Sequence, residues 1–271
     1  MKNKEESNNP EQESEKGEMH FLDHLEEFRW VVIRSLLAFI IGCVVVGVFL
    51  SVTADFLAHP LNVAKERIGH ADEIRSLVTI SPLGAFTVLL QICFLGGIAL
   101  SLPFVLYFLA TFLAPGLTKK ERSVLVPGCL MSLFLFLLGA SFAYYFILPL
   151  SIYVSLQFNA MLGLDVVWSA AEYYSFVVWM VMGIGGSFEF PLILLLLQYV
   201  EIVQPSTLRS WRQMVIVVIL LCSAIITPSD PISMVILAAP LYILYELSII
   251  VGASVVKKKK LREAQEAAEE C

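Results

Sequence analysis

The stretch from Tyr173 to Tyr199 limits the possible folds of this chain more than any other part of the sequence. It is almost entirely apolar and contains one charged side chain, Glu189. An α-helix rises about 1.5 Å per residue, so a helix of this length measures roughly 40 Å and exceeds the hydrocarbon thickness of a bilayer. We therefore expect a membrane-spanning helix here.

Glu189 is the unusual residue of this stretch. An acidic side chain at the centre of a bilayer costs ~2.5 to 3.5 kcal/mol, so we expect it to face protein or water and to be functional. Nearby glycines and Pro191 would allow close helix approach or a local break that opens a polar notch. The alternative is a structural role, in which a protonated Glu189 is hydrogen-bonded to a neighbouring helix.

The composition places the whole chain among multi-spanning membrane proteins. Hydrophobic residues make up 58% of it, the mean hydropathy is +0.79, and the charges gather at the two ends and in short loops. Residues 1–19 are polar and acidic, which predicts a disordered tail and not a secretory signal. We expect a membrane domain over residues 20–256 and a second charged tail over 257–271.

The apolar runs predict an all-α protein with six transmembrane helices. They are expected at Trp30–Val52, Pro82–Leu113, Ser123–Leu148, Tyr173–Tyr199, Gln213–Thr227 and from Ile232 to the Lys257 cluster. Pro149 should end the third span, and a structured polar loop should follow the first. The fifth span has about 15 residues, or ~22 Å, too short for an ordinary crossing. The sixth helix is expected to be short as well, because it meets Glu246 after about 14 apolar residues. If Glu246 lies near the membrane surface, the fifth and sixth spans form a short hairpin.

Basic residues predict the orientation of these helices. They gather in alternate connections and at the C-terminal end: Lys119, Lys120 and Arg122, then Arg209 and Arg212, then Lys257 to Arg262. Because cytoplasmic loops carry an excess of Lys and Arg, both termini should be cytoplasmic.

Enzymatic chemistry finds no support in the residues. All four histidines lie outside the expected spans, the five cysteines are scattered, and the sequence has neither a zinc-protease motif nor a phosphate-binding loop. Ser187 has no histidine at membrane depth to activate it. We expect no catalytic residue, no metal and no cofactor.

Several short motifs occur in order between His20 and Val256, and together they resemble the TatC family, the core membrane subunit of the twin-arginine protein translocase. They are the segments 24–29 (HLEEFR), 60–61 (PL), 112–117 (FLAPGL) with 119–122 (KKER), 187–191 (SFEFP), 227–230 (TPSD) and 245–246 (YE). Each motif alone is weak, but their order and spacing among six spans are specific.

The resemblance implies a receptor for proteins that are exported folded and carry an N-terminal signal with two consecutive arginines. It assigns this signal-peptide site to Glu27, Glu121, Arg29, Phe112 and Arg122, and it puts Glu189 in a concave groove facing the membrane. It also implies TatA-type and TatB-type single-helix partners, other TatC copies, a place in the inner (cytoplasmic) membrane, and transport driven by the proton-motive force. Arginine forks pair bidentately with carboxylates, which suits such a site.

Simpler interpretations of these residues remain open. Glu121 completes a helix-capping box with Thr118, Glu27 can pair with Arg29, and Phe112 suits a membrane interface. Glu26 is a further carboxylate, although alignment through Arg29 favours Glu27 as the ligand. The remaining candidates, Pro60, Asp230 and Glu246, have partner or structural roles, and Asp230 suits a cap for the helix beginning at Pro231.

Two other functions are also open. In a proton-coupled secondary transporter, Glu189 would cycle protons, with Glu246 as the second ionisable group of a relay. A membrane scaffold would hold partner helices through the short hairpin, and Glu27 and Glu121 would then be dispensable.

Overall fold

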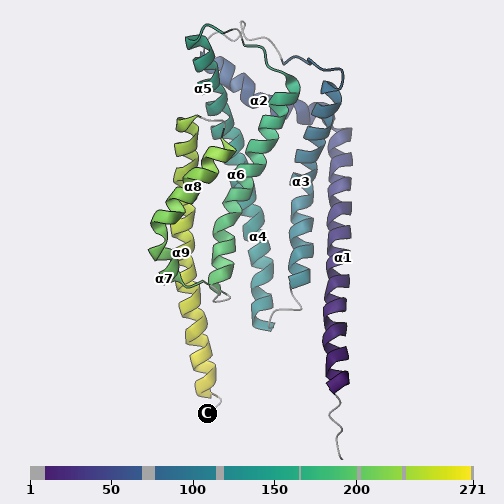
Figure 1. Ribbon diagram of the computed structural model, residues 1–271, viewed down its shortest axis with the longest axis vertical. Coiled ribbons are helices and arrows are strands. Elements are labelled where there is room, and N and C mark those ends of the chain that lie inside the picture. Colours follow the sequence, from purple (N-terminus) through teal and green to yellow (C-terminus); the bar gives the residue numbers. More distant parts are fainter. Residues whose placement is uncertain are drawn as a thin grey trace, which may run out of the picture.

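The computed structural model is a bundle of helices running along one axis (Figure 1). It describes the backbone of residues 10–68, 77–113, 119–164, 166–199, 203–227 and 230–269. The helices are α1 (Pro10–Val48), α2 (Leu50–Ile68), α3 (Gly84–Leu113), α4 (Lys119–Phe142), the π-helical turn η2 (Ala143–Ile147), α5 (Leu148–Met161), α6 (Ala170–Tyr199), α7 (Pro205–Ser210), α8 (Arg212–Ile226) and α9 (Pro231–Glu269). The prediction of an all-α membrane protein is confirmed.

Five helical segments in the described residues are long and apolar enough to cross a membrane. They are Leu25–Val48, Gly84–Leu109, Pro127–Met161, Ala170–Tyr199 and Pro231–Lys258. The apolar helix α8 has 15 residues, as expected for the short fifth span. Many large apolar side chains on the spans are exposed, which suits a chain whose surroundings are lipid.

The third span does not end at Pro149, so that prediction is wrong. Helix α4 passes through η2 directly into α5, which ends at Met161. Pro149 falls in the first turn of α5, just after the π-helical turn. A proline is tolerated in the first turn of a helical segment, because its missing N–H is not needed there.

The prediction of a short sixth helix is also wrong, because α9 has 39 residues and continues to Glu269. Residues 257–269 of the predicted tail contain mainly Lys, Glu and Ala, which are good helix formers, so α9 extends beyond its apolar part. At the other terminus, α1 begins at Pro10. Residues 10–19 are therefore helical, where we expected disorder. Glutamates at positions 11 and 13 favour a helix N-terminus, and residues 1–9 lie outside the described part.

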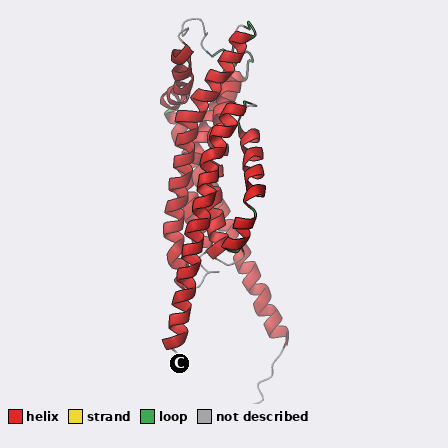
Figure 2. Cartoon of the chain, turned by 90° about the vertical axis from the view of Figure 1, so that its left-hand side faces the viewer, coloured by secondary structure: helices red, strands yellow, loops and turns green. Residues whose placement is uncertain are grey.

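The beginning of α1 and the end of α9 lie at the same end of the bundle, here called the termini end (Figure 1). The opposite end, the α2 end, carries α2 across the tops of the other helices, and Figure 2 shows the layers from the side. Helix α1 packs along α3, while α6 packs against α3, α4 and α9. At the α2 end, Val78 pairs with the segment before α6: its N–H donates to Trp168 O at 3.0 Å, and Ala170 N donates to Val78 O at 2.8 Å.

The connection after the first span, predicted to be a structured loop, contains the helix α2. Its Pro60 is fully buried and has no N–H, so the carbonyl of Phe56, one turn earlier, lacks its usual helical donor. The hydroxyl of Tyr144 donates to that carbonyl instead. Two further tyrosine hydroxyls, from Tyr173 and Tyr174, donate to other α2 carbonyls at 2.8 and 3.2 Å. Pro60 therefore has a structural role that three tyrosines of η2 and α6 support.

Candidate functional site

The predicted signal-peptide residues lie on α1, α3 and α4, which all extend to the termini end, with α3 between the other two (Figure 1). The ring of Phe28, next to Glu27 on α1, contacts the ring of Phe112 near the end of α3, with centroids 5.6 Å apart and planes at 55°. Two of the sequence motifs, far apart in the chain, are therefore in direct contact. Phe28 was not singled out from the sequence, although it lies inside the first motif.

Arg29 makes its ion pair with Glu26. The distance from Arg29 Nη2 to Glu26 Oε1 is 3.6 Å, and both side chains are about two-thirds exposed. An exposed pair of this kind contributes ~0–1 kcal/mol, so it holds Arg29 only weakly. The guanidinium also lies 5.7 Å from the ring centroid of Trp30. Glu27 is exposed on the same helix.

Glu121 and Arg122 lie in the first turn of α4. A carboxylate in the first turn of a helix is favoured by the helix dipole. The side chains of both residues, and the whole of Thr118 with the Pro115–Gly116 motif, lie outside the described part of the structure. The backbone places Glu121 at the end where Phe112 leaves α3, since α3 and α4 are joined there.

Glu189 lies in the middle of α6, half-buried, and faces α4. Ser132 of α4 donates its Oγ–H to Glu189 Oε2 at 2.7 Å, and Ser132 itself is 7% exposed. A Cβ on Gly185 would lie 2.9 Å from the ring of Phe136, so this glycine permits the close approach of α4 and α6. Helix α6 is continuous through Pro191, so the helix does not break beside Glu189.

The contact with Ser132 could not be found from the sequence, because a serine in an apolar run carries no signal of its own. It satisfies part of the hydrogen-bonding capacity of Glu189 through a neighbouring helix, which is the geometry of the structural alternative. The sequence has no Lys or Arg between residues 123 and 208, so α5 and α6 offer Glu189 no basic partner.

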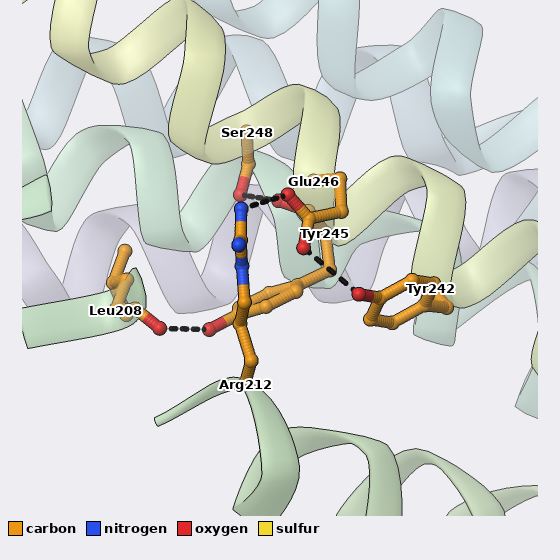
Figure 3. A network of polar contacts seen from close by, with 6 residues as sticks. All are labelled: Leu208, Arg212, Tyr242, Tyr245, Glu246 and Ser248. Carbon is orange, nitrogen blue, oxygen red and sulfur yellow. Dashed lines mark hydrogen bonds and ion pairs between the residues drawn. The ribbon is translucent and has the colours of Figure 1, made fainter. Parts of the chain in front are cut away.

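Glu246 is the centre of a polar network that joins α8 to α9 (Figure 3). Its Oε2 lies 2.7 Å from Arg212 Nη2, and its Oε1 accepts a hydrogen bond from Tyr242 at 2.9 Å. Tyr245 donates to Leu208 O at 2.7 Å, which holds α7 against the same helix. Both oxygens of Glu246 are therefore engaged, and the arginine neutralises its charge.

Asp230 caps α9, as the sequence indicated. Its Oδ2 accepts a hydrogen bond from Ser233 N at 2.8 Å, and the residue is 8% exposed. Ser151 of α5 donates to Ser233 Oγ at 2.9 Å, so this polar contact also joins α5 to α9. The described residues contain no group of three His, Cys, Asp or Glu side chains that could hold a metal ion.

Helix α8 has a largely uncovered apolar face. Met214, Val217, Leu221 and Ile225 are spaced about one turn apart and are 60–64% exposed, whereas Ile219 and Ser223 face the bundle. A face of this kind must contact lipid or another helix.

The sequence matches a model of the family described as Sec-independent protein translocase protein (TatC), over residues 23–240. Among curated proteins, it is 34% identical to the TatC of Aquifex aeolicus over 244 residues, covering 89% of this chain and 98% of the relative. It is 36% identical to the TatC of Koribacter versatilis over 267 residues, covering 95% and 94%.

Two solved structures share the fold. A crystal structure described as the twin arginine translocase receptor TatC superposes with a TM-score of 0.71 at 34% identity, covering 86% of this chain and 99% of the other. A second, described as the same receptor in DDM, gives a TM-score of 0.72 and covers 84% and 99%.

Proposed function

Since the chain belongs to the TatC family of Sec-independent protein translocase proteins, we propose that it is the subunit that recognises twin-arginine signal peptides of folded cargo. The chain is a multi-pass membrane protein of a transport family. In this role it binds the signal, nucleates the translocation complex and uses the proton-motive force, with no catalytic step of its own.

The contact between Phe28 and Phe112 carries this proposal, because it joins the segment that contains Glu27 to the end of α3. Glu121 begins α4 at the same end. Two carboxylates at one end of the bundle suit two guanidinium groups, since each arginine fork pairs with a carboxylate through two parallel hydrogen bonds. Phe112 supplies an apolar neighbour, and Arg29 and Arg122 flank the carboxylates.

The proposed topology has six crossings of the inner membrane. Both termini lie in the cytoplasm. Helix α8 is the fifth crossing, and its 15 residues require local thinning of the bilayer or packing partners. The basic residues in the first turn of α4, in α7 and at the start of α8, and in the C-terminal part of α9 belong to the termini end, which is the side that the positive-inside rule assigns to the cytoplasm.

The exposed apolar face of α8 is the proposed docking place for single-helix partners of the TatA and TatB type. A short helix disturbs the bilayer around it, and packing against a partner helix relieves this mismatch. Further TatC copies complete the proposed complex.

Glu189 is the proposed functional carboxylate inside the membrane. If its role is functional, Glu189→Gln should impair transport while the protein still folds, because glutamine keeps a hydrogen bond with Ser132. Transport and partner assembly that are both unchanged in this variant would contradict a functional role. A proton relay between Glu189 and Glu246 is disfavoured, since Arg212 already pairs with Glu246.

The test is a binding measurement with the detergent-solubilised protein and two peptides, one with Arg-Arg and one with Lys-Lys in the signal. We expect tighter binding of the arginine peptide, and its loss in both Glu27→Gln and Glu121→Gln. Glu26→Gln is the matched control, because Glu26 lies beside Glu27 and pairs with Arg29. Equal, weak binding of both peptides to every variant would reject the receptor function.

A further inference from the structure

At the α2 end, a small cavity lies between α5 and α6. It has a volume of about 220 Å³, and its walls include the rings of Trp168, Tyr173 and Phe176, the hydroxyls of Ser151 and Ser155, and the carboxylate-bearing residue Glu172. None of the residues that line it is basic. Three aromatic rings and one acidic residue form a wall that attracts a cation.

The walls of this cavity are held in place by contacts elsewhere in the fold. The backbone of Trp168 is bound by Val78, and the hydroxyl of Tyr173 donates to Leu57 O at 2.8 Å. Ser151, 2% exposed, donates a hydrogen bond to Ser233 Oγ, so the hydroxyl oxygen of Ser151 remains available to accept a hydrogen bond. Contacts with Val78, α2 and α9 therefore hold three of the residues that line the cavity.

Glu172 makes no hydrogen bond or ion pair with any residue in the described part of the chain. The absence of Lys and Arg between positions 123 and 208 means that neither α5 nor α6 can neutralise it. It is exposed, so a ligand can reach its carboxylate. An ammonium group between a carboxylate and aromatic faces gains both a charge-assisted hydrogen bond and a cation–π contact.

A second hollow of about 480 Å³ adjoins the first and shares Glu172 and Phe176 with it. It continues to Trp179, which lies further into the membrane span on the same face of α6, because residues 172, 176 and 179 recur at helical spacing. The side chain of Trp179 is 55% exposed. The polar cavity thus opens onto an apolar surface that runs toward the centre of the bilayer.

From this arrangement we propose that the two hollows bind a zwitterionic phospholipid, whose headgroup ammonium enters the cavity beside Glu172 and whose acyl chain lies along Phe176 and Trp179. The site lies where two spans, Pro127–Met161 and Ala170–Tyr199, reach the membrane surface, which is the level of lipid headgroups. A free amine would use the cavity but not the apolar surface that continues from it. This lipid site is separate from the proposed signal-peptide residues, which lie at the opposite end.

Native mass spectrometry of the full-length protein in detergent tests the proposal. Phosphatidylethanolamine and phosphatidylglycerol with identical acyl chains are titrated separately, since they differ in the ammonium group. We expect phosphatidylethanolamine to bind about tenfold more tightly than phosphatidylglycerol. This is the difference in affinity expected when an ammonium group contacts both a carboxylate and an aromatic ring. Glu172→Gln should remove this preference, and Trp168→Leu should reduce it.

The matched control is Glu66→Gln, which makes the same chemical change at an exposed position of α2, at the same end. It should keep the preference for phosphatidylethanolamine. Equal binding of the two lipids to the unaltered protein would overturn the proposal, and so would an equal loss in Glu66→Gln and Glu172→Gln. Soluble phosphorylethanolamine that displaces the lipid at equal concentration would overturn the part that requires an acyl chain. Thermal unfolding of each variant shows whether it remains folded.

Discussion

Replacing Tyr144 with phenylalanine tests how the α2 end is held together. The hydroxyl of Tyr144 donates to the carbonyl of Phe56, which lacks a helical donor because Pro60 has no N–H. Phenylalanine keeps the ring, which stacks on Phe56 at 4.5 Å, and removes only the donor. Because Tyr144 is 6% exposed, water does not readily replace the lost hydrogen bond. Leaving this partly buried carbonyl without its donor costs ~1–3 kcal/mol.

Hydrogen exchange of the α2 amides is the appropriate measurement, because the loss acts on the local opening of this helix. A cost of ~1–3 kcal/mol corresponds to an increase in exchange of roughly 5- to 150-fold. Tyr145→Phe is the control: this neighbouring tyrosine is 59% exposed, and its hydroxyl makes no hydrogen bond with the described residues. We expect no measurable change there.

Pro60→Ala completes the test, because alanine returns the N–H that Phe56 O lacks. In the Pro60→Ala background, Tyr144→Phe should cost clearly less than in the native sequence, with a coupling of about 1 kcal/mol between the two changes. If Tyr144→Phe matched Tyr145→Phe, or if its cost were the same with and without Pro60, the hydroxyl would not be the substitute donor.

Two further substitutions probe the contacts between helices. Gly42→Ala should destabilise the packing of α1 on α3 by ~1–3 kcal/mol, because its Cβ would lie 2.8 Å from the backbone oxygen of Gly97. Gly128→Ala is the control on α4: an added Cβ there has no neighbour within 4 Å, so this change should be neutral or stabilising. Thermal unfolding in detergent compares the two variants. Arg212→Gln should loosen α8 from α9 at a cost of about 1 kcal/mol, since its ion pair with Glu246 is partly exposed. Arg209→Gln is the control and should change little. Hydrogen exchange of the α8 amides measures both variants, and equal effects would contradict a specific role for the pair with Glu246.

Local patterns indicated the residues of the candidate signal-peptide site. The motif around Glu27, the aromatic Phe112 and the carboxylate Glu121 were identified from the sequence, and the fold brings the helices that carry them to one end. The contact of Phe28 with Phe112 and that of Ser132 with Glu189 were not predictable, because each joins residues from different helices. Neither a lone phenylalanine nor a lone serine indicates its partner.

The sequence by itself determined that this chain crosses a membrane, because the length and apolar character of each run are local properties, and these alone decide whether a helix is stable in the bilayer. It also determined which connections are basic, and that α8 is short. Only the tertiary structure decided that the third span continues past Pro149 and that a helix, α2, covers one end of the bundle. These features depend on a π-helical turn and on tyrosine hydroxyls that reach the carbonyls of another helix. Such contacts bring together residues far apart in the sequence, where no local pattern records them.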